Sequence, residues 1–92
     1  MGKVRAHILI EGLVQGVYFR ANTVEVAKAR KCSGWVRNTY EGGVEAVIEG
    51  EEADVRSLID WCRKGPTIAR VDHVAVDWEA YTGEFDGFTA AP

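Results

Sequence analysis

The stretch Gly12–Arg20 (GLVQGVYFR) combines residue types that could bind a small anion. It follows an alternating apolar run and precedes a helix-forming run, so it is predicted to be a loop between a strand and a helix. Gly16 lets a ligand approach the backbone, and the dipole of the following helix favours negative charge. Arg20 adds a permanent positive charge with a fork of donors suited to phosphate or carboxylate. The pattern indicates an anion-binding loop, with an ordinary glycine-containing connection as an equal alternative.

The composition indicates a single small globular domain covering residues 1–92, with 47% hydrophobic and 27% charged residues. The formal net charge of −3 argues against nucleic-acid binding by general charge attraction. Because the sequence has neither a membrane-length apolar run nor a signal segment, we expect a cytoplasmic protein. Cys32 and Cys62 lack the spacing of a metal site, so no metal or cofactor is expected and each cysteine is predicted to be a small buried hydrophobe.

The anion-binding loop needs a strand before it and a helix after it. Residues Val4–Ile10 alternate between apolar and other residues, which predicts a strand with one face on a core. His7 falls on the opposite face and is expected at the surface. Residues Ala21–Lys31 lack glycine and proline and are predicted to form a helix, which Gly34 follows closely.

The middle of the chain predicts a hairpin and a second helix. Trp35–Thr39 is interpreted as a short strand, Tyr40–Gly43 as a turn and Val44–Ile48 as the second arm, which Gly50 ends. Glu51–Lys64 has acidic residues in its first turn and basic residues in its last, as the helix dipole favours. Its apolar residues lie at i, i+3, i+4 and i+7 and form one stripe: Val55, Leu58, Ile59 and Cys62.

The last third predicts a long strand, Ala69–Ala80, with a bulge near Asp72 because Val71 is out of phase with the later apolar residues. A short final strand is expected around Phe85 and Phe88. The order β-α-β-β-α-β is typical of an α+β, ferredoxin-like two-layer sandwich. We therefore expect an antiparallel or mixed sheet with both helices on one face.

Several motifs together resemble the acylphosphatase family. Gly12–Arg20 matches that family's pattern G-x-V-Q-G-V-x-F-R at every fixed position. Gly34–Asn38, followed by Gly42 or Gly43 and then Val44, is similar to its second signature, which centres on an asparagine. Gly65–Pro66 and the residues after it resemble the family's loop after the second helix. The resemblance covers nearly the whole chain and favours the anion-binding interpretation of the loop.

The resemblance implies an enzyme that hydrolyses acyl phosphates, which are carboxylic–phosphoric mixed anhydrides, to carboxylate and inorganic phosphate without a metal. Arg20 and the backbone amides of the loop would bind the phosphoryl oxygens, and Asn38 would position the attacking water. The amides concerned belong to five residues: Gln15, Gly16, Val17, Tyr18 and Phe19. This fits phosphoryl transfer, which needs charge stabilisation and alignment more than covalent help.

Two positions depart from the family's usual pattern. Tyr18 occupies a variable slot, where its ring is expected to line or cover the mouth of the loop. Arg30–Cys32 stands where Leu-Gly-Leu is common, so Lys31 is expected at a helix end that needs a positive φ angle, at a cost of roughly 1 kcal/mol. Glu41 and Glu45 are expected to be solvated.

Two other classes of protein remain as alternatives. The first is a binding module with this fold that holds a phosphate or carbamoyl-type group without catalysis; the presence of both Arg20 and Asn38 favours catalysis. The second is an RNA-binding domain of the same element order, but the strands at Arg5–Ile10 and Val44–Ile48 lack the aromatic residues on which bases stack. We expect a monomer that binds an acyl phosphate, is inhibited competitively by phosphate, and binds neither nucleic acid nor membrane.

Overall fold

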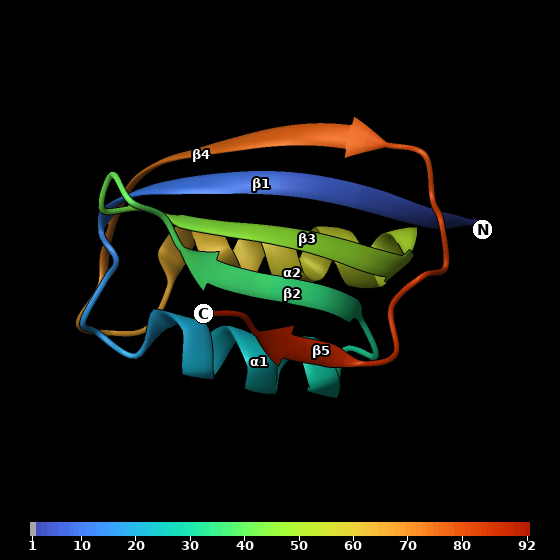
Figure 1. Cartoon of the computed structure of the whole chain (residues 1–92), viewed down its shortest axis with the longest axis horizontal. Coiled ribbons are helices and arrows are strands. Elements are labelled where there is room, and N and C mark those ends of the chain that lie inside the picture. Colours follow the sequence, from blue (N-terminus) through green and yellow to red (C-terminus); the bar gives the residue numbers. More distant parts are fainter. Residues whose placement is uncertain (1) are drawn as a thin grey trace.

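The structure, a computed structural model, describes residues 2–92. Over these residues two helices pack on one face of a five-stranded sheet whose strand order is β4-β1-β3-β2-β5 (Figure 1). The elements, in chain order, are β1 (Lys3–Leu13), α1 (Phe19–Ala29), β2 (Ser33–Asn38), β3 (Val44–Glu51), α2 (Glu52–Lys64), β4 (Arg70–Glu79) and β5 (Phe88–Ala90). The ferredoxin-like α+β fold is confirmed. The sheet is mixed, because β5 pairs parallel to β2 while the other pairs are antiparallel.

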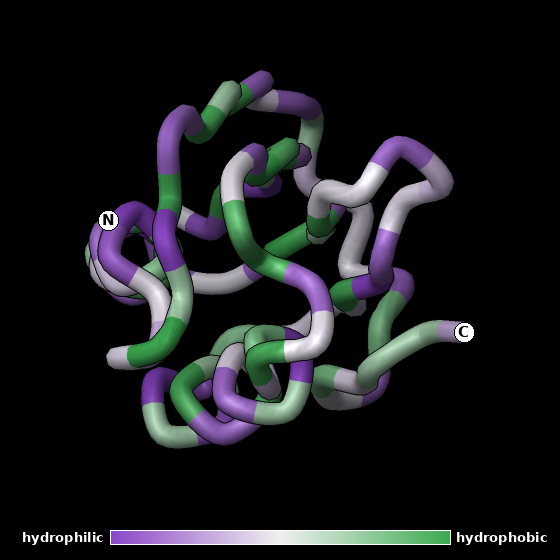
Figure 2. Tube along the Cα trace, turned by 90° about the vertical axis from the view of Figure 1, so that its left-hand side faces the viewer, coloured by the Kyte–Doolittle hydropathy of each residue, from purple (hydrophilic) through white to green (hydrophobic). Residues whose placement is uncertain are grey.

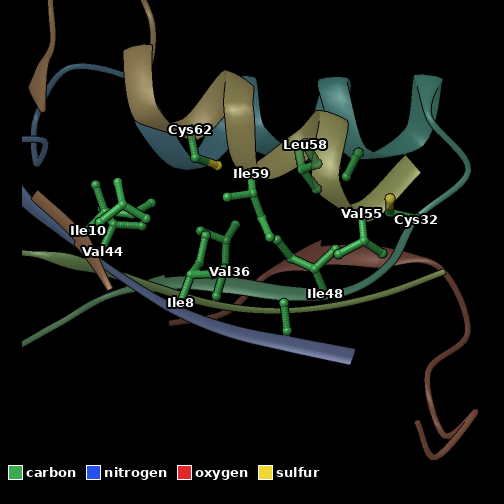
Figure 3. Packing of buried hydrophobic residues seen from close by; sticks show 14 of the residues in the cluster. Ile8, Ile10, Cys32, Val36, Val44, Ile48, Val55, Leu58, Ile59 and Cys62 are labelled. Carbon is green, nitrogen blue, oxygen red and sulfur yellow. The ribbon is translucent and has the colours of Figure 1, made fainter. Parts of the chain in front are cut away.

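The core lies between the sheet and the two helices. Ala6, Ile8 and Ile10 of β1 are fully buried, and the apolar stripe of α2 packs against this face (Figure 3). Burial of one such aliphatic side chain contributes about 1.5–3 kcal/mol. Viewed from the end of the molecule at the left of Figure 1, hydrophilic and hydrophobic residues alternate along the strands (Figure 2). This period of two turns one face of the sheet toward the helices.

The boundaries of α1 and β3 differ from the predictions. Helix α1 begins at Phe19 rather than Ala21, because Tyr18 adopts the left-handed conformation (φ 62°) and its carbonyl already accepts a bond from Asn22 N at 3.1 Å. Lys31 has φ 57°, so the expected positive φ after this helix is confirmed. The prediction that Gly50 ends β3 is wrong, since its backbone pairs with Val4 and the strand continues to Glu51.

The predicted bulge lies in β4. Glu11 pairs with His73, but the next residue, Gly12, pairs with Val71. Asp72 is therefore an extra residue on β4. It shifts the alternation along the strand, so the apolar residues after it can face the core. The bulge faces the end of β1, directly before the chain enters the predicted anion-binding loop.

The two cysteines are free and buried, as predicted. Figure 3 shows Cys32 beside Val55 at the start of α2 and Cys62 near the other end of this helix. The helices run antiparallel, so the residues near their C-terminal ends are far apart. Neither α1 nor α2, the helices of residues 2–92, has the length and apolar character needed to cross a membrane.

The sheet face opposite the helices carries a buried carboxylate that the sequence analysis did not single out. Glu49 of β3 has no solvent exposure. It accepts bonds from Arg5 Nη1 (3.2 Å), Thr82 N (2.9 Å) and Gly83 N (3.0 Å), and we call these four residues the Glu49 cluster. Burial raises the pKa of Glu49, but the hydrogen bonds from Thr82 and Arg5 outweigh it, so the net pKa lies below the ordinary value. The cluster fixes the segment between β4 and β5 to the sheet.

A second ionic group lies on the same face. Glu45, expected to be solvated, is mostly buried and accepts bonds from His7 Nε2 and from Arg37 Nε, the latter at 2.8 Å. Burial raises the pKa of Glu45, and the hydrogen bonds from His7 and Arg37 lower it below the ordinary value. His7 is half-buried rather than simply exposed, since two carboxylates flank its ring. The expectation of a solvated Glu45 was wrong because Arg37, its cross-strand neighbour on β2, supplies a partner.

Candidate active site

A cavity of about 410 Å³ lies at the N-terminus of α1, beside the ends of β2 and β5. Its wall brings together predicted site residues from both sequence motifs, including Arg20 and Asn38. The lining residues are Val14, Gly16, Tyr18, Phe19, Arg20, Ala21, Asn38 and Ala90. They include no carboxylate, so the charged side chain of the wall is the arginine. An anion is therefore the ligand that the wall favours.

The sheet topology explains why these two motifs meet. Strands β1 and β2 are each antiparallel to β3, so they run parallel to each other and end at the same edge of the sheet. This edge is at the left of Figure 1. The loop of residues 14–18 leaves β1 there, and Asn38 is the last residue of β2.

The β1–α1 loop (residues 14–18) presents backbone donors at the start of a helix. Within residues 2–92, the backbone N–H groups of residues 15–20 donate no hydrogen bond. The first turn of a helix always leaves such groups without intrahelical partners. Phe19 anchors this turn, because its ring is almost fully buried and contacts Trp61 edge-on at 5.6 Å between centroids. The donors are thus held by a rigid element.

Arg20 lies on the first turn of α1 and is half-buried. Its Nη1 donates to the carbonyl of Ala91 at 3.3 Å, directly after β5. Among the described residues this is the one hydrogen bond of the Arg20 side chain, so most of its N–H groups remain available to a ligand. The contact holds the guanidinium against the chain that leaves β5.

Asn38 is half-buried in the cavity wall, and its backbone ends the pairing of β2 with β3 opposite Val44. The carboxamide makes no hydrogen bond with the described residues, 2–92. An asparagine side chain offers both a donor and an acceptor, and here both are available on the same cavity wall as Arg20. This arrangement can orient a polar molecule next to a bound anion.

The structure places the predicted site residues in two groups. Gly16, Tyr18, Phe19, Arg20 and Asn38 line the cavity, and the Tyr18 side chain is 74% exposed at its rim. Gln15 and Val17 do not line the cavity. The Val17 side chain packs against the core, and Gln15 Nε2 donates to the carbonyls of Thr39 and Gly43. A contact of Gln15 or Val17 with a ligand in this cavity would have to come from the backbone.

The sequence analysis missed the part that β5 plays in this site. Ala90 lines the cavity and the carbonyl of Ala91 accepts the bond from Arg20. Small apolar residues that act through the backbone carry no chemical signal in a sequence. The parallel pairing of β5 with β2 brings these residues to the site, and local periodicity does not predict such long-range pairing.

Comparisons with known proteins match the whole domain. A family model described as Acylphosphatase matches residues 6–90. The chain is 48% identical over 91 residues to an acylphosphatase of Pelotomaculum thermopropionicum, with 99% of both chains covered. It is 54% identical over 84 residues to one of Syntrophus aciditrophicus, covering 91% of this chain and 88% of the relative. A crystal structure of acylphosphatase from Bacillus subtilis superimposes with a TM-score of 0.93 at 29% identity, covering 97% of this chain and 99% of that one.

Proposed function

The chain belongs to the acylphosphatase family and hydrolyses acyl phosphates, and we propose that Arg20 and the β1–α1 loop hold the phosphoryl group while Asn38 positions the attacking water. One observation carries this assignment: Arg20 of α1, residues of the β1–α1 loop and Asn38 of β2 line a single cavity although they are separated in the sequence. The products are a carboxylate and inorganic phosphate.

The phosphoryl group fits the donors at the start of α1. The backbone N–H groups of residues 15–19 and the Arg20 guanidinium supply hydrogen bonds and positive charge to its three outer oxygens. As the bond to the carboxylate breaks, negative charge remains on these three oxygens. Donors that are already in place therefore stabilise the transition state without having to move. The contact of Arg20 with Ala91 fixes the guanidinium before the substrate binds.

Asn38 aligns the nucleophile. Its carboxamide oxygen accepts a hydrogen bond from the water and its N–H₂ group donates one to the water, so one lone pair of the water faces the phosphorus. The water oxygen forms a bond with phosphorus as the bond from phosphorus to the carboxylate oxygen breaks. An asparagine is not a base, so the water proton passes to an oxygen of the substrate's own phosphate. The carboxylate leaves with the electron pair of the broken bond.

Several finer properties belong to this proposal. The domain spans residues 1–92 and works as a monomer in the cytoplasm, without metal and without nucleic-acid or membrane partners. Inorganic phosphate competes with the substrate, because it occupies the same donors. Residues 2–92 contain no group of three or more side chains arranged to hold a metal ion. Turnover of benzoyl phosphate should therefore be the same with and without a strong chelator, and a loss that Mg²⁺ or Zn²⁺ reverses would contradict this.

Two substitutions test the assigned roles. Arg20→Lys keeps a charge but loses the planar fork, so both phosphate affinity and kcat should fall. Asn38→Ala leaves the phosphate donors intact, so phosphate should bind nearly normally while kcat falls by about 10²-fold. The measurements are calorimetry with phosphate and steady-state kinetics with benzoyl phosphate. If Asn38→Ala abolished phosphate binding but left kcat unchanged, the roles would be reversed.

A further inference from the structure

We propose that the side chain of Gln15 is a positioning residue for this reaction, because it holds the phosphate-binding loop at a fixed place relative to Asn38. The inference rests on the proposed function, in which the loop binds the phosphoryl group and Asn38 orients the water. It assigns to Gln15 a second role, separate from that of its backbone N–H.

The Gln15 carboxamide uses both of its N–H donors on one structural element. Nε2 donates to the carbonyl of Thr39 at 2.8 Å and to the carbonyl of Gly43 at 2.8 Å. These two residues are the first and last of the β2–β3 turn (residues 39–43). With both donors engaged and Gln15 absent from the cavity wall, the side chain is committed to the turn rather than to a ligand.

Each end of this contact lies one residue from a part of the active site. Gln15 directly precedes Gly16, which lines the cavity, and Thr39 directly follows Asn38. The strands that carry these two parts do not pair with each other, because β3 lies between β1 and β2 in the sheet. Val44 of β3 pairs with both Ile10 and Asn38. The Gln15 side chain thus bridges two segments that the sheet leaves one strand apart.

The turn is the fixed partner in this contact. Thr39 N donates to the carbonyl of Gly43 at 2.9 Å, and Gly43 N donates to Thr39 Oγ1 at 2.9 Å. Gly43 also lies so close to β1 that a Cβ there would be 2.7 Å from the carbonyl of Ile10. The turn therefore keeps its shape without Gln15, whereas the loop loses a restraint next to Gly16.

This geometry predicts a loss of alignment rather than a loss of binding. The phosphate contacts come from the loop and Arg20 and move together when the loop shifts. The distance and angle between phosphorus and the water held by Asn38 change instead, and a misplacement of about 1 Å can cost on the order of 10²-fold in rate. A merely structural glutamine would lower stability without such a selective effect on kcat.

The first experiment compares a variant of Gln15 in the loop with a variant in the turn that Gln15 contacts. Gln15→Met keeps the approximate length and lacks both donors, so kcat for benzoyl phosphate should fall by about 10-fold while the inhibition constant of phosphate changes by less than about 3-fold. Tyr40→Ala is the matched control, since Tyr40 lies in the same turn and its fully exposed side chain takes no part in the contacts of Gln15. It should change kcat by less than about 3-fold.

The deciding experiment is a double-mutant cycle of Gln15→Met with Asn38→Ala. If Gln15 acts through the water that Asn38 holds, the same substitution in the Asn38→Ala background should change kcat by less than about 2-fold. An equal loss of kcat in both backgrounds, or no loss of kcat in the wild-type background, would overturn the inference. A normal kcat for Asn38→Ala alone would instead refute the proposed role of Asn38.

Circular dichroism shows whether each variant is folded before the kinetics are compared. Should Gln15→Met fail to fold, the same cycle is run with Gln15→Leu, which also lacks the N–H donors and adds no charge beside the anion site. The expected non-additivity and the outcome that overturns it are the same for this variant.

Discussion

The two ends of the sheet present the same kind of anion-binding groups, and they differ in what those groups bind. At the end on the right of Figure 1, the backbone N–H groups of Thr82 and Gly83, together with Arg5, donate to the carboxylate of Glu49. At the left end, Arg20 and the residues at the start of α1 line a cavity whose wall has no carboxylate.

The difference separates stability from function. In the Glu49 cluster the anion is part of the chain, so its hydrogen bonds form on folding and stabilise the native state. At the left end, in the proposed mechanism, the anion arrives with the substrate, and apart from the bond of Arg20 to Ala91 these donors make no hydrogen bond that stabilises the fold. Substitutions at the right end should therefore change the free energy of unfolding, and substitutions at the left end should change catalysis.

The largest expected effect on stability comes from Glu49→Ala. Arg5 keeps its ion pairs with Glu79 and Glu84, but the backbone N–H groups of Thr82 and Gly83 lose their buried acceptor, which should lower the free energy of unfolding by about 3 kcal/mol. Urea unfolding measures this loss. The kcat for benzoyl phosphate, measured where the variant is folded, should stay within about 2-fold of wild type.

A matched control is Glu52→Ala, which removes an exposed carboxylate paired with Arg56 one helical turn away. Such pairs contribute about 0.3–0.5 kcal/mol. Equal losses of unfolding free energy for Glu49→Ala and Glu52→Ala would contradict the role of the right end in stability. A fall in kcat that accompanies the lower stability of Glu49→Ala would contradict the separation of stability from function.

A smaller effect on the free energy of unfolding is expected when the pH is lowered. The pKa of Glu49 is lowered in the folded state, so at pH values near and below its unfolded pKa of about 4.3 the unfolded chain binds more protons than the native one. The stabilisation is therefore complete at neutral pH and is lost as the pH falls below about 5. The stability difference between wild type and Glu49→Gln should shrink between about pH 6 and pH 3. A constant difference over this range would show that the charge of Glu49 is not what stabilises the cluster.

The smallest of these effects on stability is expected when phosphate binds at the left end of the sheet. At ten times its dissociation constant, phosphate should stabilise the wild-type protein by about 1.4 kcal/mol, because it binds the folded state alone. Thermal unfolding with increasing phosphate measures this shift, with sodium chloride at equal ionic strength as the control. Arg20→Lys should show a smaller shift, and Glu49→Gln should retain the full one. A shift that persisted undiminished in Arg20→Lys would place the phosphate outside the proposed site.

The sequence predicts the local elements and several residues of the candidate cavity, because both depend on short-range patterns. The stripe from Val55 to Cys62 identifies α2 and the face that it buries, and the phase change at Val71 reveals the bulge. The motif at Gly12–Arg20 and the asparagine at the end of β2 identify the residues that the structure brings to one cavity. Each of these signals is contained within about ten neighbouring residues.

The features that the sequence did not predict depend on long-range contacts. Glu49 alternates along β3 as an exposed residue would, and its burial comes from Thr82 and Gly83 far along the chain. The contacts of the Gln15 side chain require that the β2–β3 turn lies beside the β1–α1 loop. Both follow from the sheet topology rather than from any local pattern.

The positions of the two chain ends matter for anyone who attaches this protein to something else. Strand β1 starts at Lys3, at the end of the sheet away from the cavity, whereas β5 ends at Ala90 in the cavity wall and Ala91 binds Arg20. An affinity tag, a fusion partner or a covalent tether attached after Ala91 would therefore stand beside the cavity that we propose as the phosphate site. Immobilisation through the N-terminus keeps that cavity open, and it is the orientation to choose for a sensor or a surface-bound reactor.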